Sequence, residues 1–358
     1  MSHFHTLTVS EVRHETPDAV SVVFDIPDDL EADYRFKQGQ YLTLKTEIDG
    51  AEVRRSYSIC SGLDDDEIRV AVKKVPDGLF SSFVNDRLEP GMALDVMPPM
   101  GRFTVDLEPD KARNYVAIAA GSGITPVLSI VKTVLAREPK SMVTLFYGNQ
   151  RRSSILFRQE LEDLKDRYLG RFALFHSLTR EGQDVPLFTG RIDGGKIRGF
   201  AGHLFDPADI DHYFLCGPGE MISGVKSALS DLGVPAERLH DELFTPADDA
   251  PPRPLSKRAE TVIHEGVEVE AILDGARYTF EMTDGDYSIV DAAHRQGLEL
   301  PFSCKGGMCC TCRAKVVEGS GEMALNYSLE PWEEEAGFVL CCQTRPTSPK
   351  IVVDFDHA

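Results

Sequence analysis

The sequence reads Cys304-Lys-Gly-Gly-Met-Cys309-Cys-Thr-Cys312, and a further cysteine, Cys342, follows after 29 residues. This is the C-x4-C-x2-C…C spacing of plant-type [2Fe–2S] sites, with three thiolates on one tight loop and a fourth from a distant strand. The two glycines let the backbone wrap closely, so that amide N–H groups can point at cluster sulfurs. The spacing therefore predicts a one-electron carrier in the C-terminal part of the chain.

Two other uses of these cysteines compete with the cluster. A disulfide scaffold is disfavoured, because six of the eight cysteines crowd into residues 304–342 and secreted disulfide domains are shorter and more evenly spaced. A structural zinc site is the stronger rival, although zinc sites usually pair C-x2-C with another short spacing. Cys310 and Cys341 each lie beside a ligand, and spacing alone leaves both Cys341 and Cys342 open as the fourth ligand.

Length and composition bound the class of protein. The chain has 358 residues, enough for two or three domains, and a net charge of −20, which disfavours a nucleic-acid partner because phosphates need a basic surface. We expect no membrane segment, since no apolar run approaches the ~20 residues that span a bilayer. The opening residues carry no apolar run of the signal-peptide kind, so a cytoplasmic location is expected, which also suits unpaired thiols.

The negative charge is uneven along the chain. Residues 261–358 hold 7 basic and 17 acidic residues, a net of −10. A negative face that steers onto a positive patch of a redox partner explains this excess. Solubility explains it equally well.

Composition divides the chain into four segments. A Pro-rich, polar stretch at 246–260 is expected to be a linker, because it cannot pack as a core element. Residues 1–108 alternate apolar and polar side chains, as in Val20-x-Val22-x-Phe24, and predict an antiparallel β-barrel. Residues 109–245 alternate buried strands with helices and predict an α/β domain with a parallel sheet. Residues 261–358 form the cysteine domain.

The barrel segment carries a candidate ligand site. In Arg55-Ser-Tyr57-Ser58, an arginine can clamp a phosphate, a tyrosine on the same strand face can stack on a flat ring, and a serine offers a hydrogen bond. Downstream, Gly78-Leu-Phe80-Ser81 opens a short helix whose N-terminal amides can hold a pyrophosphate. A plain helix start capped by Ser81 is the alternative.

The α/β segment carries two strand-to-helix turns. The first, Gly121-Ser-Gly123-Ile-Thr125-Pro126, stands where a parallel sheet presents amides to a phosphate. The second is Cys216-Gly-Pro-Gly-Glu-Met221, where Cys216 ends a buried strand and can lie beside a nicotinamide. An unliganded turn and a core cysteine are the alternatives. The candidate nucleotide-binding residues in these two turns are Gly121, Gly123, Thr125, Cys216, Gly217, Pro218 and Met221.

The stretch after the second parallel strand bears on the choice between NADPH and NADH. It reads Tyr147-Gly-Asn149-Gln-Arg151-Arg152, followed by two serines. An acidic residue here would bind the ribose of NADH and repel a 2′-phosphate. The two arginines favour NADPH instead, although either could simply cover the helix start.

Together and in this order, the motifs resemble the ferredoxin–NADP reductase superfamily, over roughly residues 4–245. The resemblance implies FAD, with Arg55 at its phosphates, Tyr57 on the isoalloxazine, Ser58 near N5 and the backbone of Gly78, Phe80 and Ser81 at the pyrophosphate. It implies catalytic roles for Ser58, for Cys216 and for Glu242 near the flavin. A β-grasp α+β fold is implied for the ferredoxin domain.

A closer resemblance spans nearly the whole chain. Segments such as Leu300-Pro-Phe-Ser-Cys304 and Asn326-Tyr-Ser-Leu-Glu-Pro331 are similar to the reductase subunits of phenylacetyl-CoA epoxidases. That family implies Cys342 as the fourth metal ligand, after Cys304, Cys309 and Cys312. It also implies a di-iron epoxidase as electron acceptor, in aerobic phenylacetate degradation. Reductases of other oxygenases, a free-standing NADPH diaphorase and a non-enzymatic redox sensor remain alternatives.

Overall fold

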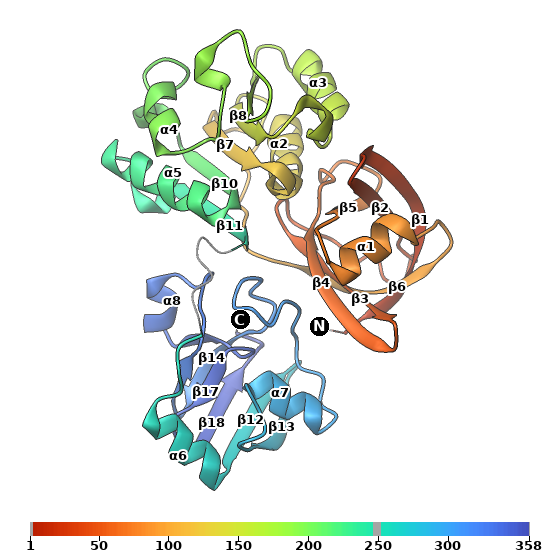
Figure 1. The fold of residues 1–358 in the computed structure, drawn as a ribbon, viewed down its shortest axis with the longest axis vertical. Helices are drawn as coiled ribbons and strands as arrows, with labels where there is room; N and C mark the ends of the chain where they lie inside the picture. Colours follow the sequence, from red (N-terminus) through yellow and green to blue (C-terminus); the bar gives the residue numbers. More distant parts are fainter. Residues whose placement is uncertain (1–2, 246–251, 358) are drawn as a thin grey trace. The chain divides into compact units, whose positions relative to one another are not determined.

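The structure is a computed structural model that describes residues 3–245 and 252–357. It divides into two compact units at residue 248. The first unit contains the predicted barrel and the predicted α/β domain, and the second contains the predicted cysteine domain (Figure 1).

The barrel has six strands: β1 (His5–Thr16), β2 (Ala19–Asp25), β3 (Tyr41–Ile48), β4 (Ala51–Ser58), β5 (Ile68–Lys73) and β6 (Ala93–Met100). They pair in the order β4-β3-β6-β1-β2-β5, and each pairing is antiparallel. A bridge between Ile59, just past β4, and Val70 of β5 joins the two edges. The predicted antiparallel barrel is therefore confirmed, and its one α-helix in the described chain, α1 (Leu79–Asp86), follows β5.

Local sequence explains the β3–β4 hairpin. Asp49 and Gly50 connect the strands, and both have positive φ, 53° and 81°. A two-residue turn with positive φ at both positions matches the twist of the flanking strands, and Asp-Gly adopts it at low cost. The alternating apolar residues of the strands, including Val20, Val22 and Phe24, form a core inside the barrel.

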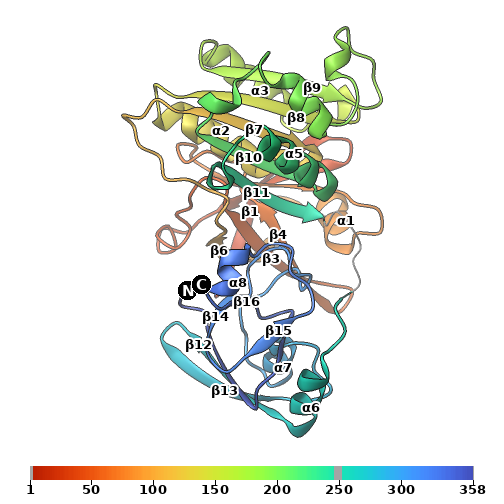
Figure 2. The same cartoon turned by 90° about the vertical axis from the view of Figure 1, so that its left-hand side faces the viewer.

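The α/β domain has five strands: β7 (Asn114–Ala120), β8 (Met142–Asn149), β9 (Phe172–Leu178), β10 (His212–Pro218) and β11 (Leu239–Thr245). They form a parallel sheet in the order β11-β10-β7-β8-β9, and Figure 2 shows them side by side. The chain therefore starts in the middle of the sheet, builds outward to β9, and then crosses to the other side of β7. The crevice between β7 and β10 is the topological switch point, where such sheets bind ligands.

Helices cover both faces of this sheet: α2 (Ile124–Arg137) and α3 (Arg158–Arg167) on one, α4 (Gly194–Phe200) and α5 (Gly219–Asp231) on the other (Figure 1). Two cores result. Alternate residues of β7 divide between them, with Ala117 facing α2 and Ile118 facing α5. Burial on both faces accounts for the nearly continuous apolar runs of the sequence.

The second unit has a five-stranded mixed sheet in the order β13-β12-β18-β14-β16 and a small sheet of β15 and β17. Its strands are β12 (Val267–Leu273), β13 (Ala276–Met282), β14 (Arg313–Glu318), β15 (Gly321–Met323), β16 (Phe338–Leu340), β17 (Thr344–Pro346) and β18 (Lys350–Asp354). Its helices are α6 (Lys257–Glu265), α7 (Ile289–Arg295) and α8 (Pro331–Glu335). The apolar face of α7 packs on this sheet in one core, as the predicted ferredoxin fold requires.

The predicted linker needs one correction. Residues 246–251 of it lie outside the described residues, but α6 begins at Lys257, inside the segment 246–260. Ser256 caps this helix by accepting a hydrogen bond from the amide of Ala259, and Ala259 and Ile263 are buried in the core of the second unit. Residues 257–260 are therefore part of the packed unit. Across the described ranges 3–245 and 252–357, the helices are too short or too polar to cross a bilayer.

Candidate functional site

A cavity of about 780 Å³ opens at the carboxyl ends of β7, β8 and β10. We name it the switch-point cavity. Five of the predicted nucleotide-binding residues line it: Gly121, Asn149, Gly217, Pro218 and Met221. The structure thus brings together both strand-to-helix turns and the end of β8, which lie far apart in the sequence.

Gly123 shapes this cavity without lining it. A Cβ atom on Gly123 would lie 2.2 Å from the carbonyl oxygen of Cys216 and 2.8 Å from the amide nitrogen of Gly217. Only glycine therefore allows the first turn to pack directly against the second. Thr125 is buried, and its hydroxyl donates to the carbonyl of Ser122 at 3.0 Å, so that side chain stabilises the turn from within.

The polar lining of the cavity is suited to a nucleotide. Asn149 is 7% exposed, and among the described residues its side-chain nitrogen has no hydrogen-bond partner of good geometry. A buried amide of this kind needs a partner, and a bound nucleotide can provide it. Gly121 has φ +55° with open space around it, and its carbonyl accepts a hydrogen bond from the Tyr147 hydroxyl at 3.0 Å.

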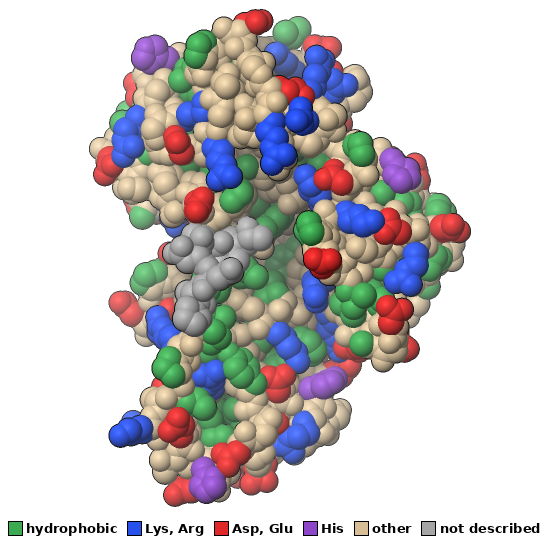
Figure 3. Space-filling view, viewed as in Figure 1, with side chains coloured by type: hydrophobic (Ala, Val, Ile, Leu, Met, Phe, Trp, Pro, Cys, Tyr) green, Lys and Arg blue, Asp and Glu red, His purple; other side chains and the backbone are tan. Residues whose placement is uncertain are grey.

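Three basic residues that the sequence analysis did not single out also line the switch-point cavity: Lys73, Arg180 and Arg191. Basic side chains are visible over the surface of the α/β domain in Figure 3. Arg180 follows β9 by two residues, at the edge where ligands bind a parallel sheet. The position of Arg180 just after a strand could therefore have predicted its place at the cavity. Arg191 comes from the long loop before α4, and no sequence pattern predicts its place.

Arg151 and Arg152 take a different position from the one predicted. Neither lines the switch-point cavity. The chain turns after β8 into a short helical turn at residues 152–154, and the amide of Arg152 donates to a carboxylate oxygen of Glu181 at 3.1 Å. Arg152 lines a second cavity of about 960 Å³, between the barrel and the α/β domain, and Arg151 is exposed.

The flavin motif lies on β4. Arg55 is exposed, Tyr57 is half-buried with its ring centroid 5.8 Å from that of Phe80, and Ser58 is buried. Arg55 can thus reach a phosphate, and Tyr57 offers a ring. Phe80 is 1% exposed and packs in the barrel core, so only its backbone can meet a cofactor.

The start of α1 leaves its first amides uncapped. Gly78 stands at the N-cap and provides no side-chain hydrogen bond. The hydroxyl of Ser81 donates to the carbonyl of Gly78 and accepts from the amide of Val75, both at 3.2 Å. Ser81 therefore does not cap the helix, contrary to the alternative considered above, and the free amides fit a pyrophosphate.

The barrel meets the α/β domain at Ser58. Its hydroxyl donates to a carboxylate oxygen of Glu242 at 3.1 Å. Glu242 on β11 is the register partner of Cys216 on β10, so all three predicted catalytic residues lie within one small region. Burial raises the pKa of Glu242 to about 7, despite the opposing hydrogen bond from Ser58, and burial raises the pKa of the Cys216 thiol well above its ordinary value.

In the second unit, strand pairing brings the predicted metal ligands together. Arg313, directly after Cys312, pairs with Leu340, two residues before Cys342. The thiol of Cys312 accordingly makes a hydrogen bond with that of Cys342, and the thiol of Cys304 makes one with that of Cys309. Cys309 and Cys341 also lie close enough to Cys312 to raise the pKa of its thiol.

Two thiol pairs are the ligand arrangement that two irons require. In a [2Fe–2S] cluster two thiolates serve each iron. Cys341 is fully buried in the core, and it is Cys342 that meets Cys312, so the geometry favours Cys342 as the fourth ligand.

The cluster loop presents donors to these sulfurs. The amide of Gly306 donates to the sulfur of Cys304 at 3.3 Å, and the Thr311 hydroxyl donates to the sulfur of Cys309 at 3.2 Å. The hydrogen bond from Cys309, together with backbone amides, lowers the pKa of Cys304 to about 5. Gly307 has φ +75°, and a Cβ there would lie 2.9 Å from the carbonyl oxygen of Leu325. The loop is therefore built to hold thiolates.

Three family models match the chain in order. They describe an oxidoreductase FAD-binding domain at residues 6–105, an oxidoreductase NAD-binding domain at 117–227 and a 2Fe-2S iron–sulfur cluster binding domain at 271–347. The chain is thus an oxidoreductase with FAD-, NAD- and [2Fe–2S]-binding domains.

Relatives share this whole arrangement. The chain is 44% identical over 356 residues to a component of the 1,2-phenylacetyl-CoA epoxidase of Escherichia coli (strain K12), covering 99% of both chains. It is 34% identical to the ferredoxin reductase component of 3-ketosteroid-9-alpha-monooxygenase of Rhodococcus rhodochrous, over 98% of this chain and 96% of that one. Its fold matches phthalate dioxygenase reductase with a TM-score of 0.59, at 22% identity and 98% coverage of each chain. The chain therefore belongs to the family of FAD- and [2Fe–2S]-containing reductase components of oxygenases that includes this component of phenylacetyl-CoA epoxidase.

Proposed function

We propose that this protein carries electrons from NADPH through FAD and a [2Fe–2S] cluster to the di-iron oxygenase of a phenylacetyl-CoA epoxidase, in aerobic phenylacetate degradation. The contact between Ser58 and Glu242 carries the proposal, because Ser58 closes the motif proposed for the flavin and Glu242 pairs in register with Cys216, at the turn proposed for the nicotinamide. When bound, FAD accepts a hydride from the reduced nicotinamide and passes the two electrons on one at a time. The chain's own residues bind, orient and shield these groups.

For FAD, we assign Arg55 to the phosphates, Tyr57 to the isoalloxazine ring and Ser58 to the region of N5. The backbone of Gly78, Phe80 and Ser81 would hold the pyrophosphate. The uncapped start of α1 and the exposed guanidinium of Arg55 support these roles. Glu242, whose raised pKa of about 7 lets it hold a proton near neutral pH, would keep that proton beside Ser58.

For the nicotinamide nucleotide, we assign Gly121, Asn149, Gly217, Pro218 and Met221 to direct contacts, since they line the switch-point cavity. Gly123 and Thr125 would act by shaping the first turn. Cys216 would lie near the end of β10, beside the nicotinamide ring. Arg180 and Arg191 both line this cavity, and they would favour NADPH over NADH because guanidinium groups suit a 2′-phosphate. Arg151 and Arg152, which lie off this cavity, are then secondary.

For the cluster, we assign Cys304 and Cys309 to one iron and Cys312 and Cys342 to the other. The pairing of their thiols supports this assignment. Cys304 and Cys309 are half-buried, whereas Cys312 and Cys342 are 2% exposed. The first pair would therefore face the electron acceptor.

The electron acceptor is proposed from sequence similarity to known reductase components. The relative that is 44% identical is a component of a phenylacetyl-CoA epoxidase, and the relative that is 34% identical serves a steroid monooxygenase. The excess of acidic residues in the second unit would help it dock on a basic surface. A cytoplasmic location is proposed because none of the eight cysteines, all within the described residues, forms a disulfide, as expected in a reducing compartment.

Reconstitution tests the proposal. The reductase is mixed with the oxygenase subunits of a phenylacetyl-CoA epoxidase, phenylacetyl-CoA and NADPH, and the epoxide product is followed. We expect product formation that requires the reductase and stops without NADPH. Product with the oxygenase of a 3-ketosteroid-9-alpha-monooxygenase, but none with the epoxidase, would reassign the partner while leaving the electron route in place.

A further inference from the structure

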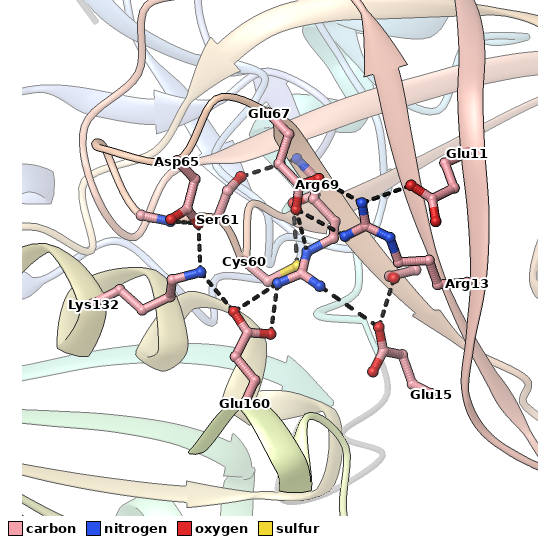
Figure 4. A network of polar contacts seen from close by, with 12 residues as sticks. Glu11, Arg13, Glu15, Cys60, Ser61, Asp65, Glu67, Arg69, Lys132 and Glu160 are labelled. Atoms are coloured by element: carbon pink, nitrogen blue, oxygen red, sulfur yellow. Dashed lines mark hydrogen bonds and ion pairs between the residues drawn. The ribbon is translucent and has the colours of Figure 1, made fainter. Parts of the chain in front are cut away.

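A network of charged side chains joins the barrel to the α/β domain, away from the contact between Ser58 and Glu242. Figure 4 shows Glu160, on α3, pointing toward both Arg69 of β5 and Lys132 of α2. Arg69 Nη2 donates to Glu160 Oε1 at 2.9 Å and to Oε2 at 2.7 Å, and Lys132 Nζ donates to Glu160 Oε1 at 2.6 Å. One carboxylate therefore ties two helices of the α/β domain to a strand of the barrel.

The network lies largely out of solvent. The side chain of Arg69 is 6% exposed, that of Lys132 15% and that of Glu160 25%. Burial would raise the pKa of Glu160, but Arg69 and Lys132 outweigh it and lower that pKa, so the carboxylate stays charged. The guanidinium of Arg69 also lies 5.2 Å from the ring centroid of Phe157, at the start of α3. A buried, hydrogen-bonded pair of this kind fixes geometry more strongly than a surface pair.

The backbone of Arg69 holds the segment that follows the flavin motif. Its carbonyl accepts the amide of Cys60 at 2.8 Å and the thiol of Cys60 at 3.2 Å, and its amide donates to the hydroxyl of Ser61 at 3.0 Å. Cys60 stands only two residues after Ser58. A displacement of Arg69 would therefore be passed directly to Ser58.

The same segment touches α2 further along. The amide of Leu63 donates to the Thr133 hydroxyl at 3.2 Å, and Asp65 forms an ion pair with Lys132. A Cβ on Gly62 would lie 2.9 Å from that of Lys132, so backbone and helix are in close approach. Residues 58–65 are thus held against the α/β domain at both ends. Glu242 contacts Ser58 at one end, and Lys132 contacts Asp65 at the other.

We propose that Arg69 and Glu160 are positioning residues for hydride transfer, because their ion pair sets where Ser58 and the flavin motif lie against the nicotinamide site. The inference rests on the proposed route from reduced nicotinamide to FAD. Neither residue lines the switch-point cavity, although both line the second cavity, so they would act on hydride transfer through the segment 58–65. Reacting atoms that must meet within a few tenths of an ångström are sensitive to such a remote support.

The test compares three variants of the full protein loaded with FAD and cluster. Glu160→Gln removes the charge but keeps the size, and Arg69 still has Glu67 at 3.2 Å, which favours folding. Lys132→Gln removes the second cation that contacts Glu160, and this variant is the substitute if Glu160→Gln does not hold FAD. Asp166→Asn makes the same change of charge at an exposed position on the same helix and is the matched control.

Flavin bleaching by NADPH is followed by anaerobic stopped flow, with NADPH and with its 4-deuterated form. For Glu160→Gln we expect the limiting rate of bleaching to fall by about ten- to hundredfold, with an unchanged Kd for NADPH and a fully expressed isotope effect. Lys132→Gln should slow bleaching less, and Asp166→Asn should match the wild type. A wild-type rate in both network variants, a change confined to the Kd, or equal slowing by Asp166→Asn would overturn the proposal.

Hydrogen exchange of the flavin-free proteins gives a readout independent of activity. In Glu160→Gln, peptides that cover residues 59–70 should exchange faster than in the wild type, and peptides of the [2Fe–2S] unit should not change. Unchanged exchange at 59–70 would overturn the proposal. If neither NADPH nor NADH bleaches the flavin of the wild-type protein, the proposed function is contradicted. The hydrogen-exchange result would still show whether the ion pair between Arg69 and Glu160 holds residues 59–70 in place.

Discussion

The hydroxyl of Ser58 donates a hydrogen bond to Glu242 at 3.1 Å, across 184 positions of sequence. Ser58 ends the strand of the flavin motif, and Glu242 lies in register with Cys216 at the nicotinamide side. Two domains that fold from separate stretches of chain therefore share one polar contact where their cofactors are proposed to meet.

The first prediction concerns the charge of Glu242. Because burial raises its pKa to about 7, the folded protein binds a proton more tightly there than the unfolded chain does. Stability is then lost as the pH rises from the ordinary carboxyl pKa to about 7, and stays constant above that. In the flavin-free protein, Glu242→Gln should raise Tm by about 2–4 °C at pH 8, equivalent to about 1 kcal/mol, and by little at pH 5.

Thermal unfolding monitored by circular dichroism at both pH values checks this. The matched control is Glu237→Gln, an exposed carboxylate just before β11, which should leave Tm unchanged at either pH. If Glu242→Gln raises Tm by the same amount at pH 5 and pH 8, the pKa of the Glu242 carboxyl is not raised and the prediction is wrong.

The second prediction separates the cluster from the flavin. Cys309→Ser should abolish the [2Fe–2S] absorbance and yet leave NADPH-dependent ferricyanide reduction within about twofold of the wild type, because the reductase part forms its own compact unit. Cys341→Ala should keep the cluster, since the thiol that meets Cys312 belongs to Cys342. Visible spectra, iron content and ferricyanide assays decide both points. Loss of the cluster in Cys341→Ala would refute the ligand assignment.

The third prediction concerns coenzyme choice. Arg180→Ala and Arg191→Ala should each raise the KM for NADPH by about tenfold or more, since a lost charge-assisted contact costs about 1.5–3 kcal/mol. The KM for NADH should hardly change. Arg198→Ala, an arginine of α4 that pairs with Asp231 and lies off the cavity, is the control. A larger increase of the KM for NADPH in Arg151→Ala would show instead that an arginine after β8 contacts the 2′-phosphate.

The fourth prediction concerns the close approach of the two nucleotide turns. Gly123→Ala would drive a methyl group to 2.2 Å from the carbonyl oxygen of Cys216, so we expect a loss of about 1–3 kcal/mol in the free energy of unfolding and weaker NADPH binding. Gly182→Ala, in open space in the same domain, should be nearly neutral. Denaturant unfolding measures the first effect and flavin bleaching against NADPH concentration the second. Equal stability of the two variants would contradict the packing described here.

The fold was largely predictable because its pattern is local. Alternation in Val20-x-Val22-x-Phe24 predicts an antiparallel strand with one face in a core, and the continuous apolar run at residues 115–119 predicts a parallel strand covered on both faces. Both strands form, although Ser21 and Val23 of β2 are buried as well. No sequence pattern predicted β11 or α4. The seven residues of α4 include three glycines, which are poor helix formers, and tertiary packing of Ile197 and Phe200 holds that helix in place.

The site was predictable where a motif is contiguous. Cys304, Cys309 and Cys312 fall on one loop, and Gly121 and Gly217 each stand in a short strand-to-helix turn of the kind that binds phosphates. Arg180 and Arg191 were missed because they reach the cavity only through the order of strands in the sheet. Arg151 and Arg152 were placed at the nucleotide because they follow β8 directly, but the turn at 152–154 directs Arg152 to the second cavity.

Anaerobic titration with NADPH follows the proposed electron route from the nicotinamide to the cluster. The purified protein, with FAD and cluster bound, is titrated anaerobically with NADPH while absorbance and low-temperature electron paramagnetic resonance are recorded. We predict loss of the flavin bands, loss of the [2Fe–2S] bands and a signal from one reduced cluster per chain, with Cys309→Ser showing the flavin change alone. A colourless protein containing zinc, or a flavin that bleaches while the cluster stays oxidised, would contradict the proposed electron route.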